Sequence, residues 1–116
     1  MEIERLEVGP RMSQIVTYGN LVYLAGQVAG KAAGKSVREQ TEDILGQIDA
    51  KLAQAGTDKS RILAATVYLS DISTFDEMNA VWDAWVVPGA TPARACVEAK
   101  LAREQYTVEI VVTAAR

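Results

Sequence analysis

The sequence predicts an α+β fold in which two helices cover one face of a mixed β-sheet. Two segments repeat apolar residues at the three- and four-residue spacing of an amphipathic helix, and the other apolar segments are rich in β-forming residues. The expected order, β-β-β-α-β-α-β-β, mixes strands and helices without strict alternation. A chain of 116 residues, 49% of them hydrophobic, has the size of one domain, so we expect a single domain over residues 1–116.

The opening third of the chain is predicted to consist of strands. Gly9-Pro10 interrupts the first segment, and residues 15–18 then have the composition of a short strand. Gly19-Asn20 follows as a two-residue hairpin connection, because both residues tolerate a positive φ angle. Residues 21–25 form the return strand. They are apolar on both faces, so we expect this strand to be covered on both sides.

Three glycines after this strand, Gly26, Gly30 and Gly34, have the spacing of a membrane helix-dimer motif. Lys31 and Lys35 lie within the motif, and no apolar segment of membrane-spanning length surrounds it. The segment also lacks the ending of a phosphate-binding loop. We therefore interpret it as an ordinary loop.

Both predicted helices begin at polar capping residues. Ser36 and Glu39 have the spacing of a capping box, and the apolar stripe that follows them ends at Gly56. A second cap near Ser73 precedes another apolar stripe, which Pro88 ends. The two helices are expected to lie on one face of the sheet.

Three strands complete the predicted sheet. Residues 62–69 are rich in β-formers, and residues 93–99 and 106–114 form two strands joined by a polar turn near Arg103. The sheet face away from the helices also carries apolar side chains, and no third helix is available to cover it. We therefore expect a second copy of the chain to cover it in a homo-oligomer.

Composition excludes several functional classes. The chain has no histidine, which excludes Ser-His-Asp and Cys-His catalysis and histidine-containing zinc sites. Its single cysteine permits no intrachain disulfide and fits a reducing compartment. The net charge of -3 argues against a nucleic-acid-binding surface. With no apolar run of membrane-spanning length and no signal peptide at residues 1–5, we expect a cytoplasmic protein that does not bind membranes.

Two charged residues stand in the apolar strands near the C-terminus, Arg94 and Glu109. Each is either a solvated or salt-bridged structural residue, or part of an anion site. In such a site Arg94 binds a carboxylate, because its planar guanidinium matches a carboxylate with two parallel hydrogen bonds, and Glu109 handles a proton or a water. In a regular hairpin centred on Arg103 the two residues project from opposite faces. Sharing one site therefore requires a shifted register or a bulge.

Four further residues have both structural and functional interpretations. Asn79 lies at the buried edge of the second helix, where it makes a packing or capping hydrogen bond or contributes to a site. Trp82 and Trp85 fit the core better than a stacking platform. Cys96 shares a strand face with Arg94. Without a histidine to lower its pKa, it is better interpreted as a small buried apolar residue than as a nucleophile.

The two strands near the C-terminus carry motifs that resemble the signature of the Rid (YjgF, L-PSP) family of reactive imine and enamine deaminases. The motifs are Pro92-Ala93-Arg94-Ala95-Cys96-Val97-Glu98 and Val108-Glu109-Ile110. The resemblance extends over nearly the whole chain, and Trp82-Asp83-Ala84-Trp85-Val86 is similar to the YoaB-like branch. Further similar segments are Leu24-Ala25-Gly26-Gln27-Val28, residues 40–56, Tyr68-Leu69-Ser70-Asp71 and residues 76–85.

The resemblance implies a chorismate-mutase-like fold assembled as a homotrimer, with three sites in clefts between subunits. It implies that Arg94 binds the substrate carboxylate and that Glu109 positions or activates water. Groups near Cys96, together with Asn79 and Gly26, then hold the substrate. The implied substrates are 2-imino acids and 2-aminoacrylate, which are hydrolysed to 2-oxo acids and ammonia without metal or cofactor.

The chain departs from this family pattern at two hydroxyl positions. Met12 stands where the active branch usually has tyrosine, and Ala25 where it often has serine. Tyr18 or Tyr23 replaces the lost phenol only if the fold directs one of them into the cleft. Whether the adjacent Arg11 also enters the cleft depends on the fold.

Three functions follow from these observations. The first is a 2-imino acid deaminase that uses Arg94 and Glu109. The second is a regulatory or binding trimer that takes small carboxylates in the same cleft without turnover. Glu109 favours the enzyme, because a site that only binds anions gains nothing from a nearby negative charge. The third is a ribonuclease, which the net charge and the absence of histidine oppose.

Overall fold

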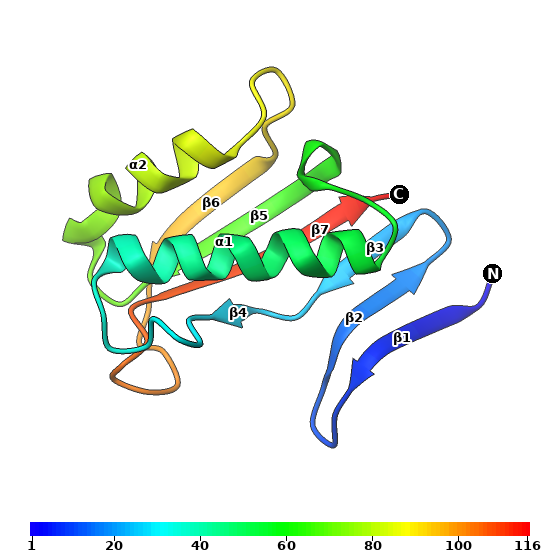
Figure 1. The fold of residues 1–116 in the computed structure, drawn as a ribbon, viewed down its shortest axis with the longest axis horizontal. Coiled ribbons are helices and arrows are strands. Elements are labelled where there is room, and N and C mark those ends of the chain that lie inside the picture. Colours follow the sequence, from blue (N-terminus) through cyan, green and yellow to red (C-terminus); the bar gives the residue numbers. More distant parts are fainter.

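A computed structural model describes residues 1–116 (Figure 1). Short 3-10 turns at Lys59–Arg61 and Ile72–Thr74 precede β5 and α2. No helix is long and apolar enough to cross a membrane. The elements are β1 (Ile3–Val8), β2 (Ser13–Tyr18), β3 (Leu21–Leu24), β4 (Gln27–Val28), α1 (Val37–Gln54), β5 (Ile62–Leu69), α2 (Phe75–Trp85), β6 (Ala93–Glu98) and β7 (Val108–Ala115).

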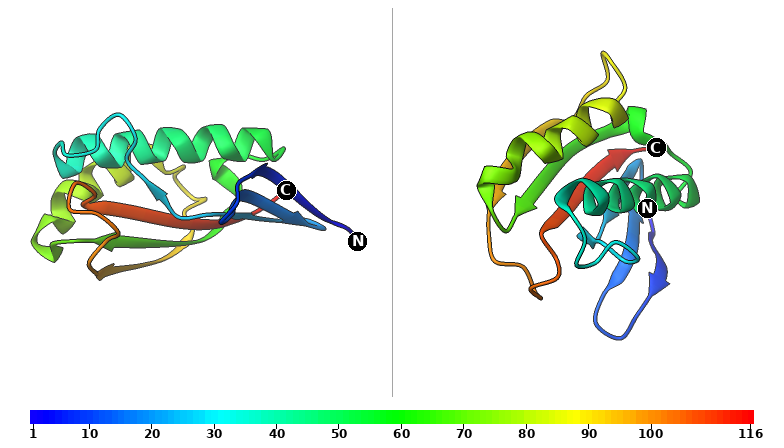
Figure 2. Two further views of the ribbon diagram at one scale, coloured as in Figure 1. Left: turned by 90° about the horizontal axis from the view of Figure 1, so that it is seen from below. Right: turned by 60° about the vertical axis from the view of Figure 1, so that its left-hand side comes forward.

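The strands form one mixed sheet with both helices on the same face (Figure 2). The strand order is β1-β2-β3-β7-β5-β6, and β4 pairs with β7 beyond the end of β3. All pairs are antiparallel except β5 and β6. This confirms the predicted α+β architecture and element order, with the short strand β4 as an addition.

The predicted hairpin between the last two strands is wrong. Strand β5 lies between β6 and β7, parallel to the first and antiparallel to the second. The chain leaves β5, crosses over through α2 and returns as β6, which is the usual connection between parallel neighbours. Residues 99–107 then pass the end of β5 to reach β7, a connection too long for a tight hairpin turn.

Local capping signals are confirmed for α1 but not for α2. The Ser36 hydroxyl accepts a hydrogen bond from the Glu39 N–H at 3.1 Å, and the chain leaves α1 through Gly56 at φ +82°. At α2 the expected cap at Ser73 is wrong. The Ser73 N–H donates to the carboxylate of Asp71. Asp71 is therefore the cap, and it caps the 3-10 turn that begins at Ile72 and leads into α2.

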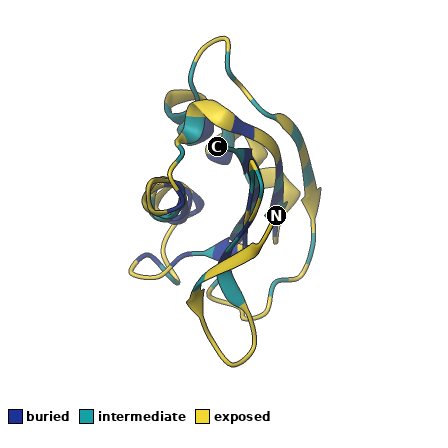
Figure 3. Ribbon diagram, turned by 90° about the vertical axis from the view of Figure 1, so that its right-hand side faces the viewer, coloured by how far each residue is buried: buried dark blue, intermediate teal, exposed yellow.

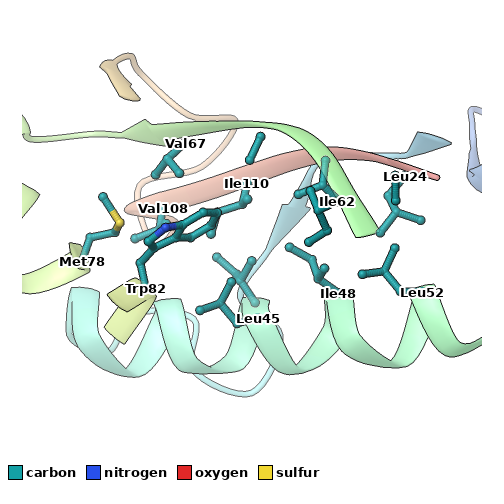
Figure 4. Packing of buried hydrophobic residues seen from close by; sticks show 14 of the residues in the cluster. Leu24, Leu45, Ile48, Leu52, Ile62, Val67, Met78, Trp82, Val108 and Ile110 are labelled. Atoms are coloured by element: carbon teal, nitrogen blue, oxygen red, sulfur yellow. The ribbon is translucent and has the colours of Figure 1, made fainter. Parts of the chain in front are cut away.

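The core lies between the helices and the sheet, as the burial pattern in Figure 3 shows. Leu45 and Ile48 of α1 and Trp82 of α2 face Val108 and Ile110 of β7 (Figure 4). Trp82 is 5% exposed, which confirms its place in the core. Trp85 packs against the edge of the same cluster.

The opposite face of the sheet is open within one chain. Along β7, the residues that alternate with the buried ones are half-buried: Glu109, Val111, Thr113 and Ala115. Tyr23 of β3 lies on this face and is 44% exposed. Nothing in the single chain packs on this face, so the expectation that residues 21–25 are covered on both sides depends on a second copy and stays a prediction. The predicted open apolar face is confirmed.

Candidate functional site

Arg94 of β6 extends over the helix-facing side of the sheet toward α2. Its Nη1 donates to the Asn79 Oδ1 at 2.8 Å, and the guanidinium carbon lies 5.1 Å from the Trp82 ring centroid and 5.8 Å from that of Phe75. No carboxylate forms a salt bridge with Arg94, and its Nε and Nη2 make no hydrogen bond within the chain. The aromatic rings and one amide thus fix a cation whose remaining donors can bind an anion.

Asn79 is half-buried, as its position on α2 predicts, and its hydrogen bond is made to Arg94. This contact brings together two of the residues that the sequence singled out. Cys96 lies next to Arg94 along the same strand face. It is half-buried against the core, and burial raises the pKa of its thiol, while the nearby Arg94 charge opposes that rise. Cys96 is therefore a protonated apolar residue rather than a reactive thiolate.

Glu109 of β7 lies on the open face and bends toward Gly26. A Cβ atom at Gly26 would overlap the Oε2 of Glu109 and would lie 3.3 Å from the Val111 side chain. The missing side chain of Gly26 is therefore what lets the Glu109 carboxylate occupy this position. Glu109 accepts no hydrogen bond from the protein and forms no salt bridge, so its carboxylate is available to a water or a ligand.

Arg94 and Glu109 lie on opposite faces of the sheet. Arg94 of β6 pairs with Ala65 of β5, which pairs in turn with Val112 of β7. The side chains of Ala65 and Val112 are buried and face the helices. Glu109 stands beside Tyr68, whose side chain projects from the other face. No bulge in the paired segments between these positions changes this parity. A single chain therefore does not bring the two residues together.

Glu109 lines a cavity of about 480 Å³ beside β4. The sequence did not predict this cavity. Of the residues singled out earlier, Met12 and Gly26 line it, whereas Tyr18, Tyr23 and Ala25 do not. Arg11 is exposed and also lies outside the lining. Other lining residues are Gln14, Val28 and Tyr106. The sequence predicted Tyr106 as the first residue of the last strand, but the residue lies in an irregular connection two positions before β7, where strand alternation does not indicate which side chains line a cavity.

The arrangement offers an anion-binding cation and a free carboxylate, and both are suited to carboxylate substrates and water. No cluster of three or more His, Cys, Asp or Glu side chains is close enough to hold a metal ion.

Residues 2–116 match the family model described as endoribonuclease L-PSP. A RutC family protein from Haemophilus ducreyi is 47% identical over 113 residues, which cover 97% of this chain and 96% of that protein. The chain belongs to the Rid/YjgF family. Within the family it is 43% identical over 115 residues to the RutC family protein YoaB from Escherichia coli, covering 99% of each.

Solved structures of Rid/YjgF proteins agree with the fold. A YjgF family member from Neisseria meningitidis matches with a TM-score of 0.97 at 47% identity, over 100% of this chain and 96% of that one. A YjgF/YER057c/UK114 family member from Mycobacterium tuberculosis matches with a TM-score of 0.84 at 28% identity, over 92% and 88%. The resemblance predicted from the Arg94 and Glu109 motifs, and from the YoaB-like segment at Trp82, is therefore confirmed at the level of the family.

Proposed function

We propose that this Rid/YjgF protein hydrolyses 2-imino acids to 2-oxo acids and ammonia, and 2-aminoacrylate in the same way once it has tautomerised to the corresponding 2-imino acid. The observation that carries the proposal is the state of Arg94. Its guanidinium is held by neutral groups, is free of any carboxylate in the chain, and keeps its Nε and Nη2 donors unused. A fixed cation with paired free donors is suited to a substrate carboxylate.

Glu109 extends this binding site to hydrolysis. With the substrate carboxylate on Arg94, Glu109 accepts a proton from water as the water oxygen bonds to the imine carbon, and returns the proton to the nitrogen. The resulting carbinolamine loses ammonia when its carbon–nitrogen bond breaks. The hydroxyl proton moves to the departing nitrogen, which leaves the 2-oxo acid. A site for binding alone gains nothing from Glu109, so we favour turnover over binding only.

The two residues meet in this proposal only between copies of the chain. Arg94 and Glu109 lie on opposite faces of one sheet. We therefore propose that Arg94 of one copy faces Glu109 of the next. The open apolar face that carries Glu109 supplies the surface for that contact. We propose a homotrimer with three equivalent clefts, because a cyclic assembly gives every copy both roles.

The proposed function is tested with an imine-trapping assay. An amino-acid oxidase generates 2-imino acids from a panel of amino acids, and semicarbazide traps those that survive. The protein is expected to lower trapped imine, and Arg94→Ala and Glu109→Gln are each expected to lower the rate by about 10²–10³-fold, the usual loss when a group that stabilises the transition state is removed. Arg61→Ala is the control, since Arg61 is exposed and its side chain makes no hydrogen bond or salt bridge.

A wild-type rate equal to buffer across the panel would reject the proposed hydrolysis and leave carboxylate binding as the function of the cleft. Incubation with RNA tests the activity named in the family description. The net charge of -3 and the absence of histidine predict no cleavage.

Gly26→Ala is expected to lower imine hydrolysis at least about 10-fold, because the new Cβ displaces the Glu109 carboxylate. Binding of a 2-oxo acid product is expected to persist, since Arg94 is untouched. The matched control is Gly46→Ala in the middle of α1, where nothing lies within 4 Å of the added Cβ. That variant keeps full activity and gains about 1 kcal/mol of stability from the better helix former. Equal activity in the two variants would contradict the role given to Gly26.

A further inference from the structure

We propose that Tyr106 orients the attacking water together with Glu109, as a hydroxyl group supplied from the connection that precedes β7. This inference rests on the proposed hydrolysis and adds a residue to it. The two side chains line the same cavity, which has a volume of about 480 Å³ and therefore has room for several waters.

The direction of the Glu109 side chain selects Tyr106 among the tyrosines. Strand β7 has β5 on one side and β4 on the other (Figure 1). Glu109 stands beside Tyr68 of β5 in the register, but its carboxylate bends the other way, over Gly26 at the start of β4. Tyr68 is accordingly absent from the cavity lining, whereas Tyr106 is part of it.

The polar groups of the cavity differ in how far the protein already uses them. The Nε2 of Gln27 donates to both Gln14 Oε1 and the Ala25 carbonyl, and the Nε2 of Gln47 donates to the Val28 carbonyl. These donors are engaged within the chain. In contrast, the Tyr106 hydroxyl makes no hydrogen bond within the chain, and no protein donor reaches the Glu109 carboxylate.

The backbone around Tyr106 is fixed on both sides. The Tyr106 N–H donates to the Arg103 carbonyl at 3.1 Å, while Gln40 binds the Gln105 carbonyl and the Thr107 N–H. The backbone that carries Tyr106 is therefore fixed before a ligand arrives, which favours orientation of a water. A water that donates one hydrogen to Glu109 and bonds through its second hydrogen to the phenol oxygen has a lone pair left for the imine carbon.

The experiment compares Tyr106→Phe with Tyr68→Phe in the imine-trapping assay. Each variant loses only one hydroxyl from a half-buried ring. For Tyr106→Phe we expect kcat to fall at least about 10-fold, with KM and the melting temperature unchanged, because Arg94 still binds the substrate. Tyr68→Phe is expected to match the wild type.

Three results would overturn the inference. The first is unchanged kcat in Tyr106→Phe while the wild type is active, which leaves the proposed hydrolysis standing. The second is a loss of kcat with a lowered melting temperature or an altered KM, which assigns Tyr106 a structural role. The third is a wild-type chain without turnover, which removes the hydrolysis and this inference together. A loss of kcat in Tyr68→Phe without one in Tyr106→Phe would overturn the inference in the same way as the first result.

Discussion

Mixed trimers of Arg94→Ala and Glu109→Ala chains are expected to regain about one third of wild-type imine hydrolysis, although each variant alone is inactive. The reason is the opposite orientation of the two side chains on one sheet. In a cyclic assembly, a cleft is intact when its Arg94 comes from one variant and its Glu109 from the other. Every mixed trimer contains one such cleft among about three, whichever variant supplies two of its chains.

The measurement uses the two variants with different affinity tags, produced together and purified through both tags, so that only mixed oligomers are assayed. Dual-tag selection enriches mixed species, so the recovered rate is compared with the composition found by native mass spectrometry. The control pairs Arg94→Ala with the double variant Arg94→Ala/Glu109→Ala, which contains no intact Arg94 and is expected to be inactive. Mixed oligomers without recovery would contradict a site shared between copies.

Features encoded by neighbouring residues could be predicted from the sequence. The Gly19-Asn20 connection and the Ser36 cap depend on φ preferences and on one hydroxyl three residues from its partner, so the segments themselves specify them. The apolar stripe of α1 and its end at Gly56 are of the same kind. The family motifs around Arg94 and Glu109 identified two functional candidates without any knowledge of the fold.

Features that depend on long-range pairing could not be predicted. Strand order decides whether β6 lies beside β7, and nothing in either strand shows that β5 fits between them. The positions of Arg94 and Glu109 relative to each other follow from that order. Counting residues around an assumed hairpin correctly predicted that the two side chains project from opposite faces, although their strands are not paired with each other. The irregular connection before β7 has no periodicity, so Tyr106 could not be placed at the cavity.

Gln40→Leu is expected to lower the free energy of unfolding by about 3 kcal/mol, because it removes three hydrogen bonds made by one fully buried side chain. Gln40 is 0% exposed. Its Nε2 donates to the carbonyls of Lys35 at 3.0 Å and Gln105 at 2.9 Å, and its Oε1 accepts from the Thr107 N–H at 3.0 Å. One side chain of α1 thus helps to hold residues 99–107 through Gln105 and Thr107.

Urea denaturation measures the loss, and Gln54→Leu is the matched control, because Gln54 is an exposed residue at the end of the same helix without a side-chain hydrogen bond. Hydrogen exchange of residues 99–107 is expected to accelerate in Gln40→Leu alone. If the connection also positions Tyr106, kcat falls in this variant under conditions where it remains folded. Equal stability and equal exchange in the two variants would show that packing, rather than Gln40, fixes the connection. Protection of residues 99–107 by Gln40 would therefore link the core of α1 to the cavity at Glu109 through two hydrogen bonds, those to Gln105 and Thr107.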